Sequence, residues 1–134
     1  MIKAGKVLTA SFDGPAVVNT FTTCQPEHGV ADDAARRQAK HAAESRAFPI
    51  MVYDPRKGDT LRERLSLQGN PGQKDDWYTI KKTGEVIDFV SFARSEGRFA
   101  KHFDSDGKPS DALLAAQDDR LANWHLLQEM AGLR

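Results

Sequence analysis

The sequence predicts an α/β fold built on a βαβ unit from a parallel sheet, with an added β-hairpin and C-terminal helices. An apolar run at residues 16–21 lacks strict alternation, which is typical of a strand covered on both faces. An alanine-rich helical pattern follows at 31–47, and a second apolar run lies at 50–53. Strand, helix and strand in this order predict a right-handed crossover between two parallel strands.

The helix expected at 31–47 is defined by its alanines. Six alanines between residues 31 and 43 fall on one half of the helical wheel, and the charged residues lie mostly opposite. Because alanine permits close approach, we expect this face to pack tightly against a neighbour. Asp32 or Asp33 is expected to cap the start of the helix, and Pro49 to end it.

The second half of the chain begins with a polar stretch. Residues 56–87 are predicted to be an irregular excursion that ends in a β-hairpin, with strands at 77–80 and 85–87 around the turn 81–84. A breaker sequence, GNPG at 69–72, interrupts the excursion. We therefore expect few core contacts from this part before the hairpin.

Two further helices are expected after the hairpin. Asp88 is a candidate N-cap for a helix running toward Phe103, which Gly97 interrupts. Ser110 is expected to cap the last helix, and Gly132 to follow its end. The last helix carries an apolar stripe of leucines and Trp124, so we expect one of its faces to be buried.

Length, charge and cysteine content limit the class of protein. We expect the 134 residues to form one domain, with a βαβ core at 1–55, the excursion and hairpin at 56–87 and a helical tail at 88–134. Nineteen basic and nineteen acidic residues give a net charge of zero, so nucleic acid is not an expected partner. The single cysteine excludes an internal disulfide, and no apolar run is long enough to span a membrane. We expect a cytoplasmic protein.

Cys24 lies in the expected strand-to-helix loop, where α/β proteins often place functional residues. With His28 it has a C-x3-H spacing, which suits half of a zinc site or a Cys–His nucleophilic dyad. Zinc needs three or four ligands, and a dyad needs an orienting group and an oxyanion hole; no motif marks either. A buried, unreactive thiol is the third interpretation, and residue types alone favour it. No phosphate-binding G-x-G-x-x-G or Walker A motif is present.

Spaced motifs from residue 13 to residue 103 change the interpretation of Cys24. They are DGPA at 13–16, TCQPEHG at 23–29, ADD at 31–33, QAK at 38–40, ESRAFP at 44–49, YDP at 53–55, ERLSLQGNP at 63–71, DW at 76–77 and EGRFAKHF at 96–103. In this order they resemble the C-terminal stretch of pyruvate:ferredoxin (flavodoxin) oxidoreductases and related 2-oxoacid:ferredoxin oxidoreductases.

The resemblance implies a fragment of the thiamine-binding fold and a role for the cysteine loop. Enzymes of this family oxidatively decarboxylate a 2-oxoacid such as pyruvate, using thiamine diphosphate, Mg²⁺ and coenzyme A, and form an acyl-CoA. Electrons pass through iron–sulfur clusters to ferredoxin or flavodoxin. The resemblance implies that Cys24 is the fourth thiolate of the [4Fe–4S] cluster nearest the thiamine. Glu27 and His28 would then orient the loop and tune the cluster potential.

The resemblance also implies that this chain is one part of a larger enzyme. The family's other cluster cysteines and its magnesium-binding Gly-Asp-Gly segment are missing from the 134 residues. We therefore expect a C-terminal fragment of the thiamine-binding domain that is inactive alone and has the remainder of the oxidoreductase as its partner. A parallel sheet cut at this point leaves an unpaired edge, so we also expect a homo-oligomer. The alternative is a stand-alone, non-catalytic α/β module that binds a protein through its alanine face or last helix.

Overall fold

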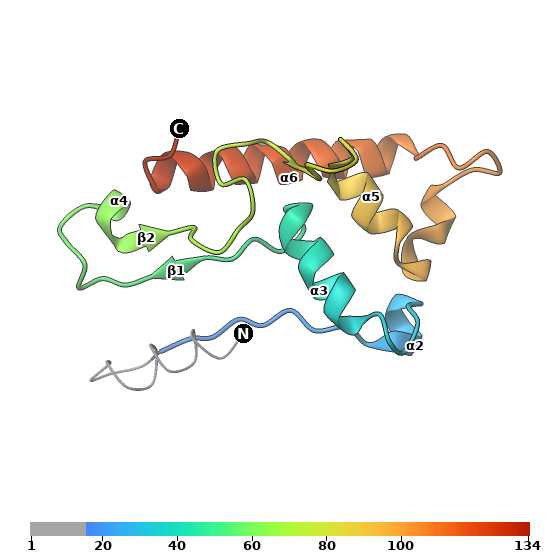
Figure 1. Cartoon of the computed structure of the whole chain (residues 1–134), viewed down its shortest axis with the longest axis horizontal. Helices are drawn as coiled ribbons and strands as arrows, with labels where there is room; N and C mark the ends of the chain where they lie inside the picture. Colours follow the sequence, from blue (N-terminus) through green and yellow to red (C-terminus); the bar gives the residue numbers. More distant parts are fainter. Residues whose placement is uncertain (1–15) are drawn as a thin grey trace.

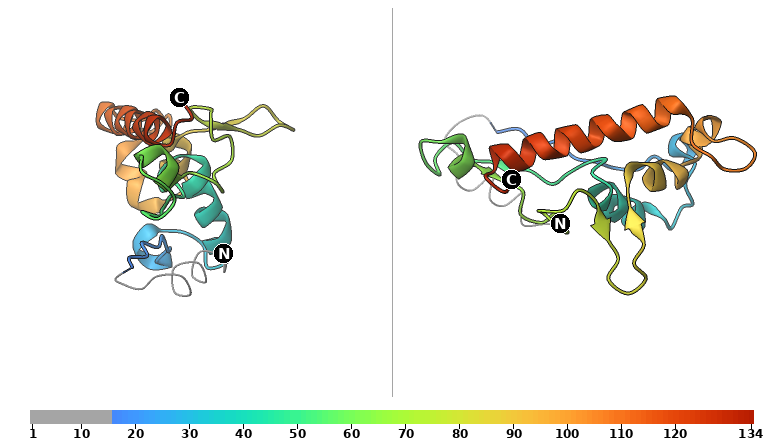
Figure 2. Two further views of the ribbon diagram at one scale, coloured as in Figure 1. Left: turned by 90° about the vertical axis from the view of Figure 1, so that its left-hand side faces the viewer. Right: turned by 90° about the horizontal axis from the view of Figure 1, so that it is seen from above.

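The computed structural model describes residues 16–134 as a mixed α/β structure of helices and two small antiparallel sheets (Figure 1). The helices are α2 (Gln25–His28), α3 (Ala35–Glu44), α4 (Leu61–Arg64), α5 (Phe89–Arg94), the 3₁₀ helix η1 (Gly97–His102) and α6 (Asp111–Met130). The strands are β1 (Val52–Tyr53), β2 (Leu65–Ser66), β3 (Tyr78–Thr79) and β4 (Val86–Ile87). The long helix α6 lies across one side of the molecule, and α5 packs against it (Figure 2).

The parallel βαβ unit is not found among the described residues. Residues 16–21 are extended without pairing to a strand, whereas β1 confirms a strand within 50–53. β1 pairs antiparallel with β2, with Val52 opposite Ser66, because the chain returns through α4. Residues 16–21 run toward α2, and the chain after α3 runs back in the opposite direction (Figure 1). Residues 1–15, which the expected core includes, lie outside the described range.

The alanine-rich helix is shorter than predicted at both ends. α3 begins after Ala34, which makes no side-chain cap, so the prediction of an Asp32 or Asp33 cap is wrong. The helix ends before Pro49, because Arg46 adopts a left-handed conformation with φ 58°. The expected close packing is confirmed for the C-terminal half of the face, where Ala42 and Ala43 are buried.

The region expected to be irregular contains α4 and β2. Thr60 and Glu63 form a capping box at the start of α4: the Glu63 amide donates to Thr60 Oγ1, and the Thr60 amide donates to Glu63 Oε2 at 3.0 Å. The T-x-x-E spacing that specifies this arrangement is present in the sequence. Once α4 turns the chain, Leu65 and Leu67 enter the core.

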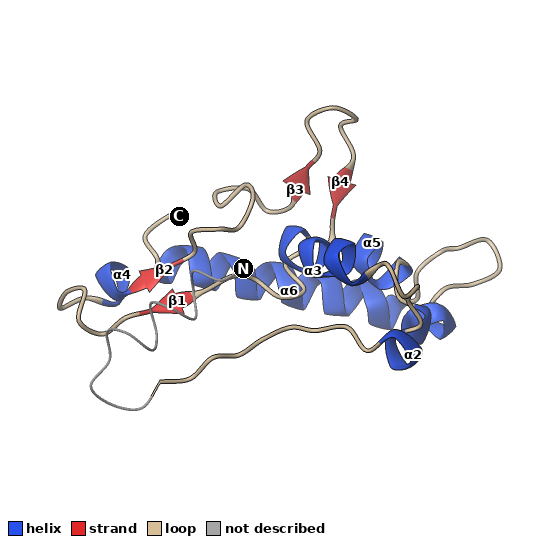
Figure 3. Ribbon diagram, turned by 60° about the horizontal axis from the view of Figure 1, so that its bottom comes forward, coloured by secondary structure: helices blue, strands red, loops and turns tan. Residues whose placement is uncertain are grey.

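The predictions for the hairpin and the later helices are confirmed. β3 and β4 pair with Tyr78 opposite Ile87, and the hairpin projects away from the helices (Figure 3). The Ser91 amide donates to Asp88 Oδ1 at 2.8 Å at the start of α5. The Leu113 amide donates to Ser110 Oγ at the start of α6. Within residues 16–134, no helix combines the length and the apolar character that crossing a membrane requires.

A buried arginine organises the centre of the molecule. Arg46 is 1% exposed, and its guanidinium donates to backbone carbonyls of the 71–76 loop, including Pro71 O at 2.9 Å and Gly72 O at 2.8 Å. The same group lies 4.3 Å from the ring centre of Trp124 on α6. Burial lowers the pKa of Arg46 to about 10, so it remains a cation at neutral pH. Arg46 thus joins the end of α3, the 71–76 loop and α6.

Candidate functional site: the Cys24 turn

Cys24 is the N-cap residue of α2 and is exposed to solvent. Its backbone is extended, with φ −104° and ψ 108°, and its carbonyl accepts the first helical hydrogen bond from the His28 amide at 2.8 Å. The interpretation as a buried thiol is therefore wrong. The sequence correctly placed Cys24 on a loop before a helix, but the adjacent element is the single turn α2 and not α3.

The Cys24 turn, which we define as residues 24–30, closes with a glycine. Gly29 has φ 61°, its amide donates to Pro26 O, and the Val30 amide donates to Gln25 O. These two bonds form a Schellman motif, which satisfies carbonyls at the end of the helix. A four-residue helix has little stability of its own, and none of the residues of α2 is buried. The turn must therefore be held by contacts with other elements.

The side chain of His28 makes such contacts. Its Nδ1 lies 3.6 Å from Glu96 Oε1, and its Nε2 lies 3.3 Å from Arg98 Nη1. Its ring also lies 6.3 Å from that of Phe21, whose ring contacts Phe48 and Phe92 in the core. His28 thus connects the turn to the start of η1 and to the aromatic core.

Glu96 is the buried charge of this region, with 1% of its surface exposed. Its Oε2 accepts from Arg98 Nε at 2.5 Å, and its Oε1 accepts from Gln38 Nε2 at 3.0 Å. Gln38 is itself buried on α3 and also donates to Ser95 Oγ at 2.9 Å. Charge-assisted bonds of this kind offset the cost of removing a carboxylate from water.

The backbones of the Cys24 turn and η1 meet at two glycines. The Gly97 amide donates to Gly29 O at 3.2 Å. A Cβ placed on Gly29 would lie 2.8 Å from Gly97 Cα, which is closer than carbon atoms approach in proteins. Neither position therefore accepts a side chain without movement of the other segment.

Of the three predicted site residues, the structure places Cys24 and His28 on one turn but does not join their side chains. No hydrogen bond between the Cys24 thiol and the His28 ring occurs within the described part of the chain. Glu27 is exposed and makes no polar contact with a described residue. Sequence reasoning missed Gln38, Glu96 and Arg98, although the motif EGRF at 96–99 was available as a signal.

The side chains of the described residues do not form a metal site by themselves. Among residues 16–134, no group of three or more His, Cys, Asp or Glu side chains is arranged to hold a metal ion. A [4Fe–4S] cluster normally needs four thiolates, and the sequence has one cysteine. The donor set therefore does not fit a complete cluster, and Cys24 could contribute only one ligand of a site shared with another polypeptide segment.

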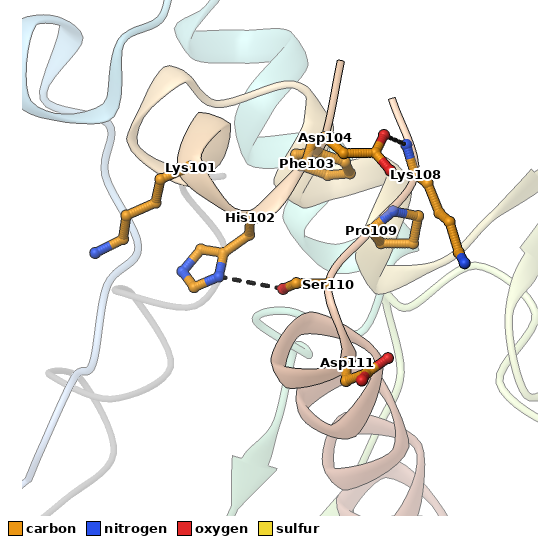
Figure 4. Close-up of a pocket in the computed structure, with 8 residues that line it drawn as sticks. All are labelled: Lys101, His102, Phe103, Asp104, Lys108, Pro109, Ser110 and Asp111. Atoms are coloured by element: carbon orange, nitrogen blue, oxygen red, sulfur yellow. Dashed lines mark hydrogen bonds between the residues drawn. The ribbon is translucent and has the colours of Figure 1, made fainter. Parts of the chain in front are cut away.

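A second location, an open pocket of about 420 Å³, lies where α6 begins (Figure 4). His102 Nδ1 and Ser110 Oγ lie 3.4 Å apart on its wall, and the Lys108 amide donates to Asp104 Oδ1 at 2.7 Å. These polar groups contact one another across a turn. They mark a local structural arrangement, and we assign no function to it.

No family model, curated protein or solved structure matches this chain.

Proposed function

We propose that this chain is the C-terminal part of the thiamine-diphosphate-binding domain of a cytoplasmic 2-oxoacid:ferredoxin (flavodoxin) oxidoreductase. In this proposal Cys24 supplies one thiolate to a [4Fe–4S] cluster, and the remainder of the enzyme supplies the other three. The observation that carries the proposal is the exposed cysteine on a short turn held by residues 96–98 and by the ring of Phe21. A ligand shared between segments needs this combination of access and fixed position.

Each part of the turn has a role in this proposal. The thiolate of Cys24 would bind iron, and the bound cluster would supply electron transfer away from the thiamine. His28 would orient the turn through its two ring nitrogens. Glu27, which is exposed, would contribute charge near the cluster without holding the turn. The isolated chain would be inactive, because thiamine diphosphate, Mg²⁺ and coenzyme A bind elsewhere in the enzyme.

The segment 16–21 bears on how the parts would join. It is extended, and Val17 and Val18 are 87% and 59% exposed. We propose that this segment pairs with upstream strands of the remainder of the enzyme and so completes a parallel sheet. Exposed β-branched residues in an extended, unpaired segment suit such an addition.

The ligand assignment is tested by co-expressing the chain with the upstream part of a 2-oxoacid:ferredoxin oxidoreductase. The copurified complex is expected to show the electron paramagnetic resonance signal of a reduced [4Fe–4S] cluster and to reduce ferredoxin or flavodoxin. Cys24→Ala is expected to abolish most of that signal, because a cluster normally requires four thiolates. Thr22→Ala, at an exposed neighbouring position, is the matched control and should retain the cluster. Unchanged electron transfer in Cys24→Ala would refute the assignment.

The isolated chain is expected to self-associate. Apart from the two valines, Met51 and Tyr53 are about half exposed, so the unpartnered segments carry apolar surface. Sedimentation velocity over a wide concentration range should show a weight-average mass that rises above 14.8 kDa. A single monomeric species at high concentration would contradict this expectation.

A further inference from the structure

The Cys24 turn is held by a segment about seventy positions later in the sequence. Glu96, Gly97 and Arg98, which we call the tail clamp, contact the turn through a buried carboxylate, a backbone amide and a guanidinium. Three consecutive residues therefore contact two consecutive residues, His28 and Gly29. Because α2 is a single turn with no side-chain cap, these contacts decide where it sits.

Arg98 determines which nitrogen of His28 carries the proton. A guanidinium only donates hydrogen bonds, so His28 Nε2, which faces Arg98 Nη1 at 3.3 Å, must be an acceptor. The proton of the neutral ring is then on Nδ1, which faces Glu96 Oε1 at 3.6 Å. For the neutral ring, the contact with Arg98 thus assigns the Nδ1–H tautomer. Nδ1 lies within ion-pair distance of Glu96 but makes no hydrogen bond to a described residue.

Glu96 connects the tail clamp to the rest of the molecule. Its two carboxylate oxygens accept separately from Arg98 and from Gln38, and Gln38 lies on α3. Because each oxygen has its own donor, the orientation of the carboxylate is fixed. A movement of η1 relative to α3 would break the bond to Gln38, so the clamp has a defined position from which to hold His28.

Gly97 adds a steric requirement. A Cβ placed on Gly97 would lie 3.1 Å from Gly29 O and 3.2 Å from Gly29 Cα. Gly97 is not among the glycines with positive φ, so an alanine there would add a methyl group without backbone strain. The closeness of the two backbones therefore explains a glycine at this position.

We infer that the tail clamp is the positioning device of the Cys24 turn: Glu96, Gly97 and Arg98 set the place and orientation of the cysteine. As a role toward a cluster ligand, this inference rests on the proposed function. The structural part of the inference, that the turn depends on residues 96–98, applies to the isolated chain and can be tested on it.

The test uses the isotope-labelled 134-residue chain and four variants. Gly97→Ala pushes the turn away, Arg98→Met removes the guanidinium, and Arg98→Lys keeps the charge without the fork geometry. Arg94→Met is the matched control, because Arg94 contacts Gly107 and Phe103 and not the turn. Amide hydrogen exchange is measured for His28, Gly29 and Val30, whose amides bond within the turn. The imidazole nitrogen shifts of His28 are recorded at pH 8 for every variant.

In Gly97→Ala and Arg98→Met, we expect exchange of the three amides to accelerate about tenfold, the effect of losing one net hydrogen bond. The His28 nitrogen shifts should move away from the Nδ1–H tautomer in Arg98→Met. Arg98→Lys should recover part of the protection, because a lysine can pair with Glu96 but cannot also reach His28 in the same geometry. Arg94→Met should leave both measurements unchanged.

Wild-type exchange and nitrogen shifts in both Gly97→Ala and Arg98→Met would overturn the inference. Loss of protection throughout α6 would also overturn it, because the clamp would then hold the whole fold and not the turn. These readouts need no cluster. If the wild-type co-expressed complex forms no cluster, the proposed function fails, but the exchange and shift measurements still test the tail clamp. If the cluster forms, the clamp variants should alter its resonance signal without abolishing it, unlike Cys24→Ala.

Discussion

Replacing Arg46 with methionine is expected to lower the free energy of unfolding by about 3 kcal/mol or more, because it removes several hydrogen bonds from a buried cation and leaves their partly buried carbonyls without this donor. The guanidinium donates to carbonyls of the 71–76 loop and to Ala43 O, and methionine can donate to none of them. The apolar stem of methionine retains packing, so the loss isolates the hydrogen bonds. Denaturant unfolding followed by circular dichroism measures the change.

Two variants control for charge and for non-specific effects. Arg46→Lys keeps a cation but cannot form the forked set of bonds, so it should lose most of the same stability. Arg134→Met removes an arginine that is about half exposed and that, among residues 16–134, pairs only with Asp76, and it should change stability by about 0.5 kcal/mol or less. A stability loss in Arg46→Met no larger than that in Arg134→Met would contradict the central role of Arg46.

Replacing Trp124 with alanine is expected to cost about 3–5 kcal/mol, the range for truncating a buried aromatic side chain. Trp124 is fully buried on α6, and its Nε1 donates to Asp75 O at 2.9 Å. Alanine leaves a large cavity and also removes the 2.9 Å indole donor to that carbonyl. Thermal unfolding should show a correspondingly lower transition temperature, with the hairpin and α6 losing structure together.

Trp124→Phe separates the two contributions. It keeps an aromatic ring beneath the Arg46 guanidinium but removes the N–H donor, so we expect a loss of about 1–2 kcal/mol. Because Arg46 and Trp124 touch, the losses in Arg46→Met and Trp124→Ala should not add, and a double-mutant cycle measures their coupling. Full additivity would show that the two side chains act independently.

Local signals in the sequence predicted the second half of the fold well. Asp88 and Ser110 cap their helices, and the KKTG turn joins a hairpin, because each of these signals acts over a few residues. The capping box of Thr60 and Glu63 was an equally local signal, and including it would have identified α4.

The direction of strand pairing could not be predicted in the same way. The apolar runs at 16–21 and 50–53 indicate extended structure, but they do not specify a partner. Arg46 shows the difficulty: its left-handed backbone ends α3 early and turns the chain, yet arginine carries no such local preference. Its conformation is determined by the carbonyls it reaches in the 71–76 loop, which are distant in sequence.

The same distinction between local signals and long-range contacts applies to the candidate site. Cys24 and His28 were found because their types and spacing are visible within one loop. Their supports, Gln38 and the tail clamp, were not found, because a contact between residue 28 and residue 98 depends on how α3 and η1 pack. The two glycines that meet there, Gly29 and Gly97, are separated by 67 residues, so neither predicts the position of the other.

The projecting β3–β4 hairpin lies in the sequence between two parts of the chain that contact each other in the folded molecule. The Cys24 turn and Arg46 come before the hairpin, whereas the tail clamp and Trp124 come after it. At its tip, Gly84 has open space around it, and residues 81–86 are all exposed. The tip is therefore a suitable attachment point for a fluorophore or an epitope. A group attached there extends into solvent and leaves the contacts between the two parts of the chain unchanged.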